Sequence, residues 1–396
     1  MPSLGLRNRW VWPLVVAMIF VIVEIYLAPT SSLDVDSGWY AQLAYQYLGD
    51  SPQQAHHLAL QLWCADQPIK DCMGKFVTHF PPTGSPTYSA IFATRPGYPA
   101  TIAGLSLLIG NLRLAIWVIP MVSTLLAGLG IYWLLRLLGL APALAAAGQV
   151  LLYVLPTGTW GVHALTEATI TACAIATILG GVLLARSRFI MGTVLLVAGL
   201  AIMSWFKYST AMPLAGLVLL AAIALWWRSG ADRRGLAILG GVSGVTVAFL
   251  LYLSSAMHLP GFNETAQDLF TNHFNKPDVT DVPQRMISAN ADYWAHFLNV
   301  DSNNALMLFG LVVGLVSLFR HHRVAAMLTL AITLTGFALA AAHPDPTAGN
   351  RLYLLAWLGA IVGIPVFAHR VGINRGGQSA ATPQEETQTI TVTAAN

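Results

Sequence analysis

Charged side chains are scarce in this sequence. Only 9% of its 396 residues are Asp, Glu, Lys or Arg, whereas 56% are hydrophobic, and the mean hydropathy is +0.63. Apolar runs of roughly 18 residues or more recur along the chain, and runs of that length are typical of membrane-spanning helices. The composition therefore places the chain among membrane proteins and not among soluble globular domains.

Short segments of alternating hydrophobicity, which are typical of outer-membrane barrels, are also lacking. The long continuous runs instead predict an all-α polytopic membrane protein with about ten transmembrane helices. The predicted spans lie near residues 11–28, 112–135, 141–158, 165–185, 189–206, 210–227, 235–257, 304–319, 324–342 and 352–368. The apolar stretch 100–109 is too short to cross a bilayer core of about 30 Å, so we expect a juxtamembrane helix there.

The chain lacks a basic patch. Its net charge of +3 is spread over the ends of apolar runs, which does not indicate a nucleic-acid partner. Basic residues are in excess in alternate short connections, for example at Arg136, Arg186 and Arg228, and this pattern predicts cytoplasmic N- and C-termini. The long polar segments 29–98 and 259–303 are then extracytoplasmic, and we expect an integral protein of the plasma (inner) membrane.

Cysteine is rare, with three residues in the chain. Cys64 and Cys72 share the first outer segment, where an oxidising compartment would let them close a short disulfide loop. A zinc site that also uses His56 and His57 is the alternative, although no standard ligand spacing is present. No cofactor is certain from the sequence, and the metal ligands are unknown.

The sequence shows no internal repeat, which disfavours the transporter classes that are built from repeated halves. Residues 1–371 are predicted to form one membrane domain, with juxtamembrane helices in the large first outer segment. Residues 372–396 are rich in Gly, Ser, Thr and Gln and have few large apolar side chains, so they predict a disordered cytoplasmic tail.

Two aspartates lie where the first predicted span meets water. Asp34 or Asp36 could accept a proton from a hydroxyl group or bind a divalent cation at this depth. Alternatively, Asp36 is the N-cap of a following juxtamembrane helix. In that helix Trp39, Leu43 and Tyr47 share one face, which predicts that it lies on the membrane surface.

The same residues carry a resemblance to a known family. Asp36-Ser37-Gly38-Trp39-Tyr40-Ala41, followed by Arg95-Pro96-Gly97-Tyr98-Pro99, resembles the GT-C superfamily of membrane glycosyltransferases, and most closely the protein O-mannosyltransferases and lipid A aminoarabinose transferases. In that family Asp-Glu-x-x-Tyr-Ala carries the catalytic aspartate in the first outer loop, and here Ser37 replaces the second acid. The resemblance implies that Asp36, or else Asp34, is the catalytic residue and that a polyprenyl-phosphate sugar is the donor.

Three cationic residues at the outer ends of spans are candidates for binding the donor phosphate. Arg95 and Arg351 could form paired hydrogen bonds with phosphate oxygens, and Lys207 could act as a point charge. Alternatively, all three extend to lipid headgroups. Tyr353 completes an Arg-x-Tyr segment similar to one that GT-C members often place before a late span.

Other outer residues give weaker signals. His163 and Glu167 would pair across one turn of a helix, and Glu167 is also a candidate for substrate binding. His343 and Asp345 either shape a sugar pocket near Arg351 or are ordinary loop residues. The segment 259–303 mixes aromatic side chains with Asn and Asp, a combination found both in sugar sites and in interfacial loops.

We therefore predict a membrane glycosyltransferase of the cell envelope. It would transfer a hexosyl or pentosyl group from a polyprenyl-phosphate donor to a glycan, lipid or protein acceptor on the extracytoplasmic face, with inversion at the sugar. A transporter or lipid flippase is the alternative from another class, and a non-catalytic scaffold is a third.

Overall fold

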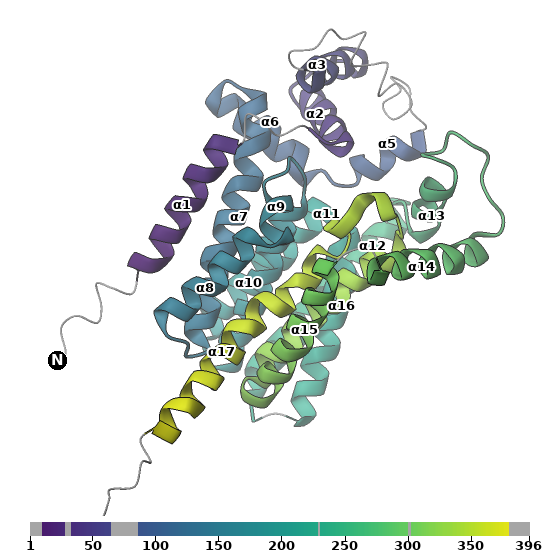
Figure 1. The fold of residues 1–396 in the computed structure, drawn as a ribbon. Coiled ribbons are helices and arrows are strands. Elements are labelled where there is room, and N and C mark those ends of the chain that lie inside the picture. Colours follow the sequence, from purple (N-terminus) through teal and green to yellow (C-terminus); the bar gives the residue numbers. More distant parts are fainter. Residues whose placement is uncertain (1–9, 28–32, 65–85, 229, 300–301, 380–396) are drawn as a thin grey trace, which may run out of the picture.

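The computed structural model of the protein describes residues 10–27, 33–64, 86–228, 230–299 and 302–379, and every regular element in these ranges is a helix (Figure 1). Seven of the described helices are long and apolar enough to cross a membrane. They are α7 (Leu112–Leu137), α10 (Glu167–Ala185), α11 (Phe189–Arg228), α12 (Arg233–Ala256), α15 (Ser302–His321), α16 (Arg323–Ala342) and α17 (Trp357–Ser379). The predicted all-α membrane class is confirmed, and the number of spans stays a prediction.

The element α11 is a helical hairpin. Its 40 residues would extend about 60 Å as one straight helix, which is twice the thickness of a bilayer core. The backbone leaves helical geometry at Lys207, with φ −161° and ψ 82°. The two ends of α11 lie close together, because the Ser187 hydroxyl donates to Asp232 Oδ2 at 2.5 Å. The chain therefore reverses at Lys207, which agrees with separate spans over 189–206 and 210–227.

The helix α10 lies in the centre of the bundle, because 83% of the residues in its apolar 18-residue stretch are buried. Glycine lets it approach the first half of α11. A Cβ atom on Gly180 would lie 2.7 Å from the backbone nitrogen of Leu196, and one on Gly192 would lie 2.9 Å from the Gly180 carbonyl oxygen. Small residues at helix interfaces let the two backbones pack closely. This packing matters in a membrane, because the hydrophobic effect does not drive helices together in lipid. This packing fixes the position of Glu167, the first residue of α10.

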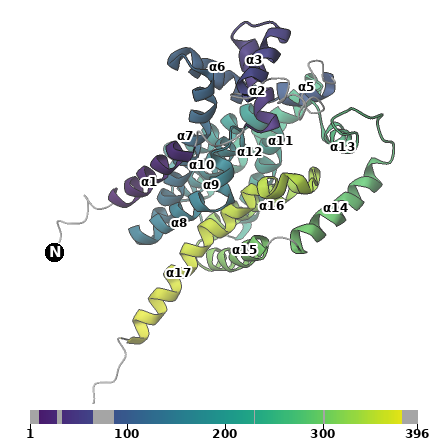
Figure 2. The ribbon, with the colours of Figure 1, turned by 45° about the horizontal axis from the view of Figure 1, so that its top comes forward.

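Four shorter helices form a layer over one end of the bundle (Figures 1 and 2). They are α2 (Val35–Tyr47), α3 (Pro52–Cys64), α5 (Pro86–Ala93) and α6 (Gly97–Ile109). The rings of Tyr40 and Tyr98 are fully buried and lie 5.1 Å apart at their centroids. The Tyr98 hydroxyl donates to the carbonyl oxygen of Ile116 at 2.9 Å, which ties α6 to α7. The juxtamembrane helix expected at 100–109 corresponds to α6.

The remaining described elements lie around this core. They are α1 (Val11–Leu27), α8 (Pro142–Val154), α9 (Pro156–Gly161), α13 (Phe262–Phe270), α14 (Val282–Asn299), η3 (Pro346–Arg351) and η4 (Leu354–Ala356). The helix α1 packs on α8, since the rings of Phe20 and Tyr153 stack at 4.1 Å. The helices α13 and α14 lie beside α5 and α16, at one side of the bundle (Figure 2).

The helix α2 bears out one prediction in part. Trp39, Leu43 and Tyr47 follow one another at four-residue spacing along this helix, but Trp39 is buried whereas Tyr47 is 55% exposed. The helix also packs Tyr40 and Ala44 against its neighbours in the layer, and its place on the membrane surface stays a prediction.

Two further predictions fall partly outside the described residues. The helix α17 continues to Ser379, beyond residue 372, where the sequence predicted the tail to begin, and residues 380–396 lie outside the described part of the chain. Cys64 forms a disulfide, so its thiolate is not available to zinc, and Cys72 lies outside the described residues.

Candidate functional site

Asp36 lies in the first turn of α2. The N-cap of this helix is Asp34, whose side chain makes no capping hydrogen bond, so the N-cap role considered for Asp36 is wrong. The carboxylate of Asp36 instead accepts a hydrogen bond from Nη2 of Arg351, at the end of η3. The two side chains come from opposite ends of the sequence and are each about one-fifth exposed, at 21% and 19%.

Glu167 is the second carboxylate at this position. Its Oε1 accepts hydrogen bonds from Arg351 Nε at 3.1 Å and from Lys207 Nζ at 3.4 Å. The Glu167 side chain is 8% exposed. Since Lys207 is the residue at which α11 reverses, the kink places its ammonium group beside the start of α10. Arg351 thus bridges the two carboxylates, and Lys207 adds a second cation to Glu167.

Arg95 is the third cation, in the link between α5 and α6. Its Nη1 donates to the Tyr40 hydroxyl at 3.2 Å, and its guanidinium lies 5.5 Å from the centroid of the Phe92 ring. The charge of Arg95 also acts on Asp36 and Glu167. Hereafter we call Asp36, Glu167, Arg95, Lys207 and Arg351 the ionic network. Lys207 and Arg351, two of the three cationic candidates, meet at Glu167, whereas Arg95 donates to Tyr40.

The ionic network contains unequal numbers of positive and negative groups. Three cations and two carboxylates leave a net charge of +1. Burial alone would raise the pKa of Asp36, but the charge of Arg351 and its hydrogen bond hold that pKa below the ordinary value for Asp. Asp36 is therefore ionised at neutral pH and is a weak proton acceptor while Arg351 is bound to it.

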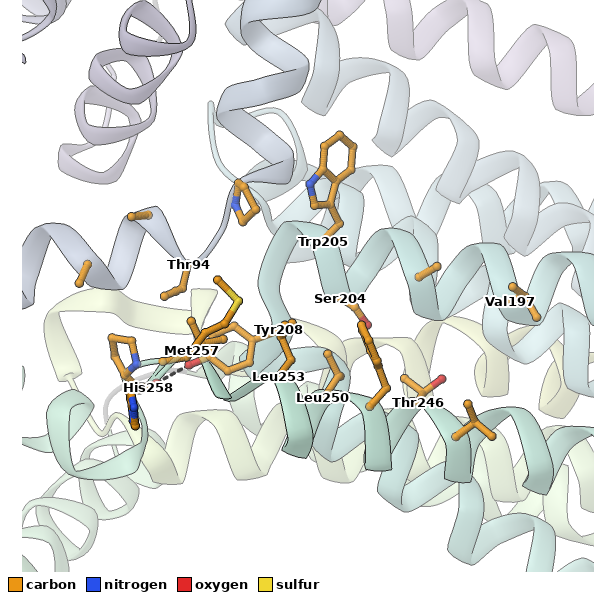
Figure 3. Close-up of a pocket in the computed structure, with 18 of the residues that line it drawn as sticks. Thr94, Val197, Ser204, Trp205, Tyr208, Thr246, Leu250, Leu253, Met257 and His258 are labelled. Atoms are coloured by element: carbon orange, nitrogen blue, oxygen red, sulfur yellow. Dashed lines mark hydrogen bonds between the residues drawn. The ribbon is translucent and has the colours of Figure 1, made fainter. Parts of the chain in front are cut away.

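A cavity of about 630 Å³ lies between α11 and α12 (Figure 3), and no side chain of the ionic network lines it. Thr94 and Pro96, which flank Arg95 in the sequence, line this cavity. Trp205 and Tyr208, which lie close to Lys207 in the sequence, line it as well. The rest of its lining is mostly aliphatic and aromatic, and extends along α11 and α12 as far as Val197, Val242 and Thr246. Its volume and lining suit an apolar ligand chain.

The predicted pairing of His163 with Glu167 is wrong. Residues 162–166 are not helical, because α9 ends at Gly161 and α10 begins at Glu167, so the two side chains do not share a helix. The Nδ1 atom of His163 instead lies 3.0 Å from Oδ2 of Asp34. Asp34 therefore contacts a histidine, whereas Asp36 contacts Arg351 within the ionic network.

Two contacts lead from the His163 ring to Asn350, the residue before Arg351. The His163 ring packs on Trp160 with ring centroids 4.7 Å apart. The Trp160 indole nitrogen donates to Oδ1 of Asn350 at 2.5 Å, and Asn350 precedes Arg351 in the chain.

Tyr353 lies in the core. Its side chain is 3% exposed, its hydroxyl donates to Oδ1 of Asn304 at 2.6 Å, and its ring packs on Phe297 at 5.0 Å. These contacts stabilise the junction of η3 and η4 with α15. Tyr353 therefore holds the segment that carries Arg351, and its position does not favour the predicted substrate contact.

His343 is the C-cap residue of α16. Its Nδ1 is buried and has no hydrogen-bond partner among the described residues. Burial lowers the pKa of His343, so the ring is neutral at pH 7. The charges of Asp36, Asp268 and Asp345 act on it.

Two nearby residues were missed by sequence reasoning. Nδ1 of His273 lies 2.9 Å from Oδ1 of Asp268, and the His273 ring lies 4.7 Å from the ring of Tyr88 on α5. The hydrogen bond with Asp268 raises the pKa of His273. The only sequence signal for this pair was the mixture of polar and aromatic residues in segment 259–303.

Within the described ranges, no group of three or more His, Cys, Asp or Glu side chains is arranged to hold a metal ion. No family model matches this chain, and no curated protein sequence matches it. The ionic network and the apolar cavity are therefore the features from which a function is inferred.

Proposed function

We propose that the protein is a membrane glycosyltransferase that takes a sugar from a polyprenyl-phosphate donor on the extracytoplasmic side of the membrane. The observation that carries this proposal is the ionic network itself, a buried group of three cations and two carboxylates, together with an apolar cavity that is lined by sequence neighbours of Arg95 and Lys207. A lipid-linked phosphate has the matching form, with one charged group at the end of a long apolar chain. The resemblance of residues 36–41 to the GT-C motif agrees with it.

The charge of the network supports a phosphodiester ligand. A polyprenyl-phosphate sugar carries one negative charge, which equals the net charge of +1 left by the three cations and two carboxylates. Arg95 and Lys207 are the cations whose sequence neighbours line the cavity, so the phosphate would bind between them. The apolar chain would then lie along α11 and α12.

The same groups supply a mechanism for the transfer step. A bond forms between the acceptor oxygen and the anomeric carbon while the bond from that carbon to the phosphate oxygen breaks. The leaving lipid phosphate gains a negative charge, which Arg95, Lys207 and Arg351 stabilise. The acceptor hydroxyl proton goes to Asp36, and this step becomes easier as Arg351 shifts from Asp36 toward the phosphate, because Asp36 then regains basicity.

The direct test is donor turnover by the purified protein. Tritiated mannose, glucose and arabinose derivatives of polyprenyl phosphate are incubated with the protein and a membrane extract as acceptor source. We expect one donor to be consumed, and we expect Asp36→Asn to reduce the rate by about 10²–10⁴-fold, as loss of a general base does. Asp281→Asn, which breaks an exposed pair with Arg285, is the matched control and should retain full activity.

Two outcomes would contradict the proposal. Absence of turnover with every donor would exclude this activity class, and normal turnover by Asp36→Asn would remove the ionic network from the reaction. Movement of a fluorescent lipid phosphate across proteoliposomes without release of sugar would favour the flippase alternative.

The proposal also requires ten spans with the ionic network outside the cytoplasm. Ser51 is exposed at the start of α3, in the same layer as Asp36. A single cysteine at this position (Ser51→Cys) should react with an impermeant maleimide in intact cells. Reaction only after the cells are opened would reverse the orientation.

A further inference from the structure

A group of basic side chains lies at the end of the bundle opposite the ionic network. We call Arg320, His321, His322, His369 and Arg370 the basic cluster. The first two close α15, and the third is the N-cap residue of α16. The last two lie on α17, about 20 Å along that helix from its start, which follows η3 and η4.

The helices α15 and α17 lie side by side and run parallel (Figures 1 and 2). A Cβ atom on Gly310 would lie 3.1 Å from Cβ of Ala360, and one on Gly363 would lie 2.2 Å from Cα of Gly314. The later residue of one helix thus meets the later residue of the other, which fixes both their direction and their register.

This register brings His321 and Arg370 together at the ends of the two helices. His321 lies seven residues after Gly314, and Arg370 lies seven residues after Gly363. Seven residues are almost two helical turns, so each side chain lies on the same face of its helix as the glycine contact, about 10 Å further on. The charge of Arg370 acts on both His321 and His322, which agrees with this placement.

No carboxylate next to these residues in the sequence balances the basic cluster. Segments 316–323 and 364–375 contain no Asp or Glu. The Nε atom of Arg370 is buried without a hydrogen-bond partner among the described residues. Buried polar atoms in native proteins are nearly always hydrogen-bonded. The ionic network contains its own carboxylates, whereas the basic cluster has an acceptor still to find.

The start of α16 adds to the positive potential at this place. Its N-cap residue, His322, makes no side-chain capping hydrogen bond. The N-terminus of α12 differs, because the Asp232 carboxylate accepts hydrogen bonds from Arg234 N at 2.8 Å and Gly235 N at 3.4 Å. An uncapped helix N-terminus attracts anions through its free N–H groups and its dipole.

Exposed apolar side chains precede the two arginines on α15 and α17. Val316 lies four residues before Arg320, and Phe367 lies three residues before Arg370, and both apolar side chains are exposed. Residues three or four apart share one face of a helix. The surface therefore passes from apolar to cationic toward the ends of these helices, as a phospholipid passes from acyl chain to phosphate.

We propose that the basic cluster binds the phosphate of an anionic phospholipid from the leaflet at that end of the bundle. Arg320 and Arg370 would pair with phosphate oxygens, and the acyl chains would lie on Val316 and Phe367. Basic groups between spans bind anionic headgroups in this way. The apolar side chains favour a lipid over a soluble anion, because they continue the site into the membrane. The inference does not rest on the proposed transferase function.

The test is native mass spectrometry of the purified full-length protein, titrated with three probes. They are dioleoyl phosphatidylglycerol, which is anionic, dioleoyl phosphatidylcholine, which has the same acyl chains but no net charge, and glycerol phosphate, which has no acyl chain. We expect phosphatidylglycerol to bind at least about fivefold more tightly than phosphatidylcholine, and glycerol phosphate not to be retained.

Two variants test whether binding occurs at the basic cluster. Arg320→Gln and Arg370→Gln should each weaken phosphatidylglycerol binding about fivefold, the usual effect of one arginine near an anionic headgroup. Arg233→Gln is the matched control. It removes the same charge at the same end of the bundle, but from α12, where the guanidinium lies 5.8 Å from the centroid of the Trp226 ring. Its binding should equal that of the wild-type protein.

A thermal melt of each variant separates loss of binding from loss of folding, and if one variant unfolds the other decides. Three results would overturn the assignment. Equal binding of phosphatidylcholine would remove the role of charge, and binding of glycerol phosphate as tight as that of phosphatidylglycerol would assign the site to a soluble anion. Phosphatidylglycerol binding that both folded variants keep, or that Arg233→Gln weakens equally, would leave these arginines with a role in orientation only.

Discussion

Charged side chains lie at both ends of the helical bundle, but their surroundings differ. At the end formed by α2, the start of α10 and η3, the side chains of Asp36, Glu167 and Arg351 are 8–21% exposed, and Arg351 contacts both carboxylates. At the opposite end, which each half of α11 reaches about 30 Å from its reversal, Arg228 and Arg323 are exposed, and Arg323 donates to the Arg228 carbonyl oxygen at 3.2 Å.

The difference separates two uses of charge in a membrane protein. The exposed arginines need no carboxylate partner, because water and headgroups solvate them, and they agree with a role in setting orientation. The buried network needs internal counterions, since unpaired charges of that burial would be costly. The buried network, which is of mixed sign and drawn from distant segments, is where we propose that a ligand binds, and the predictions below test this distinction.

The largest effect on stability is expected from Arg351→Gln. This change leaves Asp36 and Glu167 close together without the cation that bridges them. We expect a loss of about 3 kcal/mol in the free energy of unfolding, as for breaking a buried ion pair, together with loss of donor turnover. Thermal melting in detergent would measure it.

The matched control for that variant lies at the other end of the bundle. Arg323→Gln removes an exposed guanidinium and should change the free energy of unfolding by less than about 0.5 kcal/mol. Equal destabilisation by the two variants would remove the contrast between the two ends.

Lys207→Gln should have a smaller effect, mainly on donor binding. Glu167 keeps its bond from Arg351 in this variant, so the fold is retained. Loss of one charge-assisted contact to a phosphate corresponds to about 10-fold or more in the KM for the donor. Lys276→Gln, on an exposed turn, is the control. An unchanged KM in Lys207→Gln would place the phosphate elsewhere.

Sequence reasoning succeeded where a feature depends on length or on the type of side chain. The short run at 100–109 could not span a bilayer and forms the helix α6. The cations Arg95, Lys207 and Arg351 were expected to bind the donor phosphate or to extend to lipid headgroups. Two of them already have counterions within the chain, because Arg351 contacts Asp36 and Glu167, and Lys207 contacts Glu167.

It failed where tertiary packing decides the partner. The spacing of His163 and Glu167 predicted a pair on one helix, but the break between α9 and α10 separates them. Glu167 instead meets Arg351, 184 residues away. The pair of Asp268 and His273 depends on a left-handed turn that the residue types Asn-His-Phe do not reveal.

The variant Asp34→Asn tests which of the two aspartates, Asp34 or Asp36, is the general base. Asp34 contacts His163, and the two side chains are 31% and 33% exposed, so this pair is worth at most about 1 kcal/mol. We expect the turnover of this variant to fall by less than about fivefold. If Asp34→Asn is inactive while Asp36→Asn is active, Asp34 is the base and the ionic network only organises the site.

The smallest effect concerns acid stability. Because Arg351 holds the pKa of Asp36 below its ordinary value of about 3.9, the folded state gains stability from this carboxylate above that value. As the pH falls, Asp36 is protonated in the unfolded chain before it is protonated in the folded protein. The stability that its charge contributes is therefore lost as the pH falls toward the lower pKa of the folded state. The wild-type protein should therefore melt at a higher temperature than Asp36→Asn at pH 7, and the difference should shrink between pH 4 and pH 3. A difference that stays constant over this range would show that the interaction of Asp36 with Arg351 contributes nothing through its charge, and Asp36 would then resemble the exposed residues at the other end of the bundle.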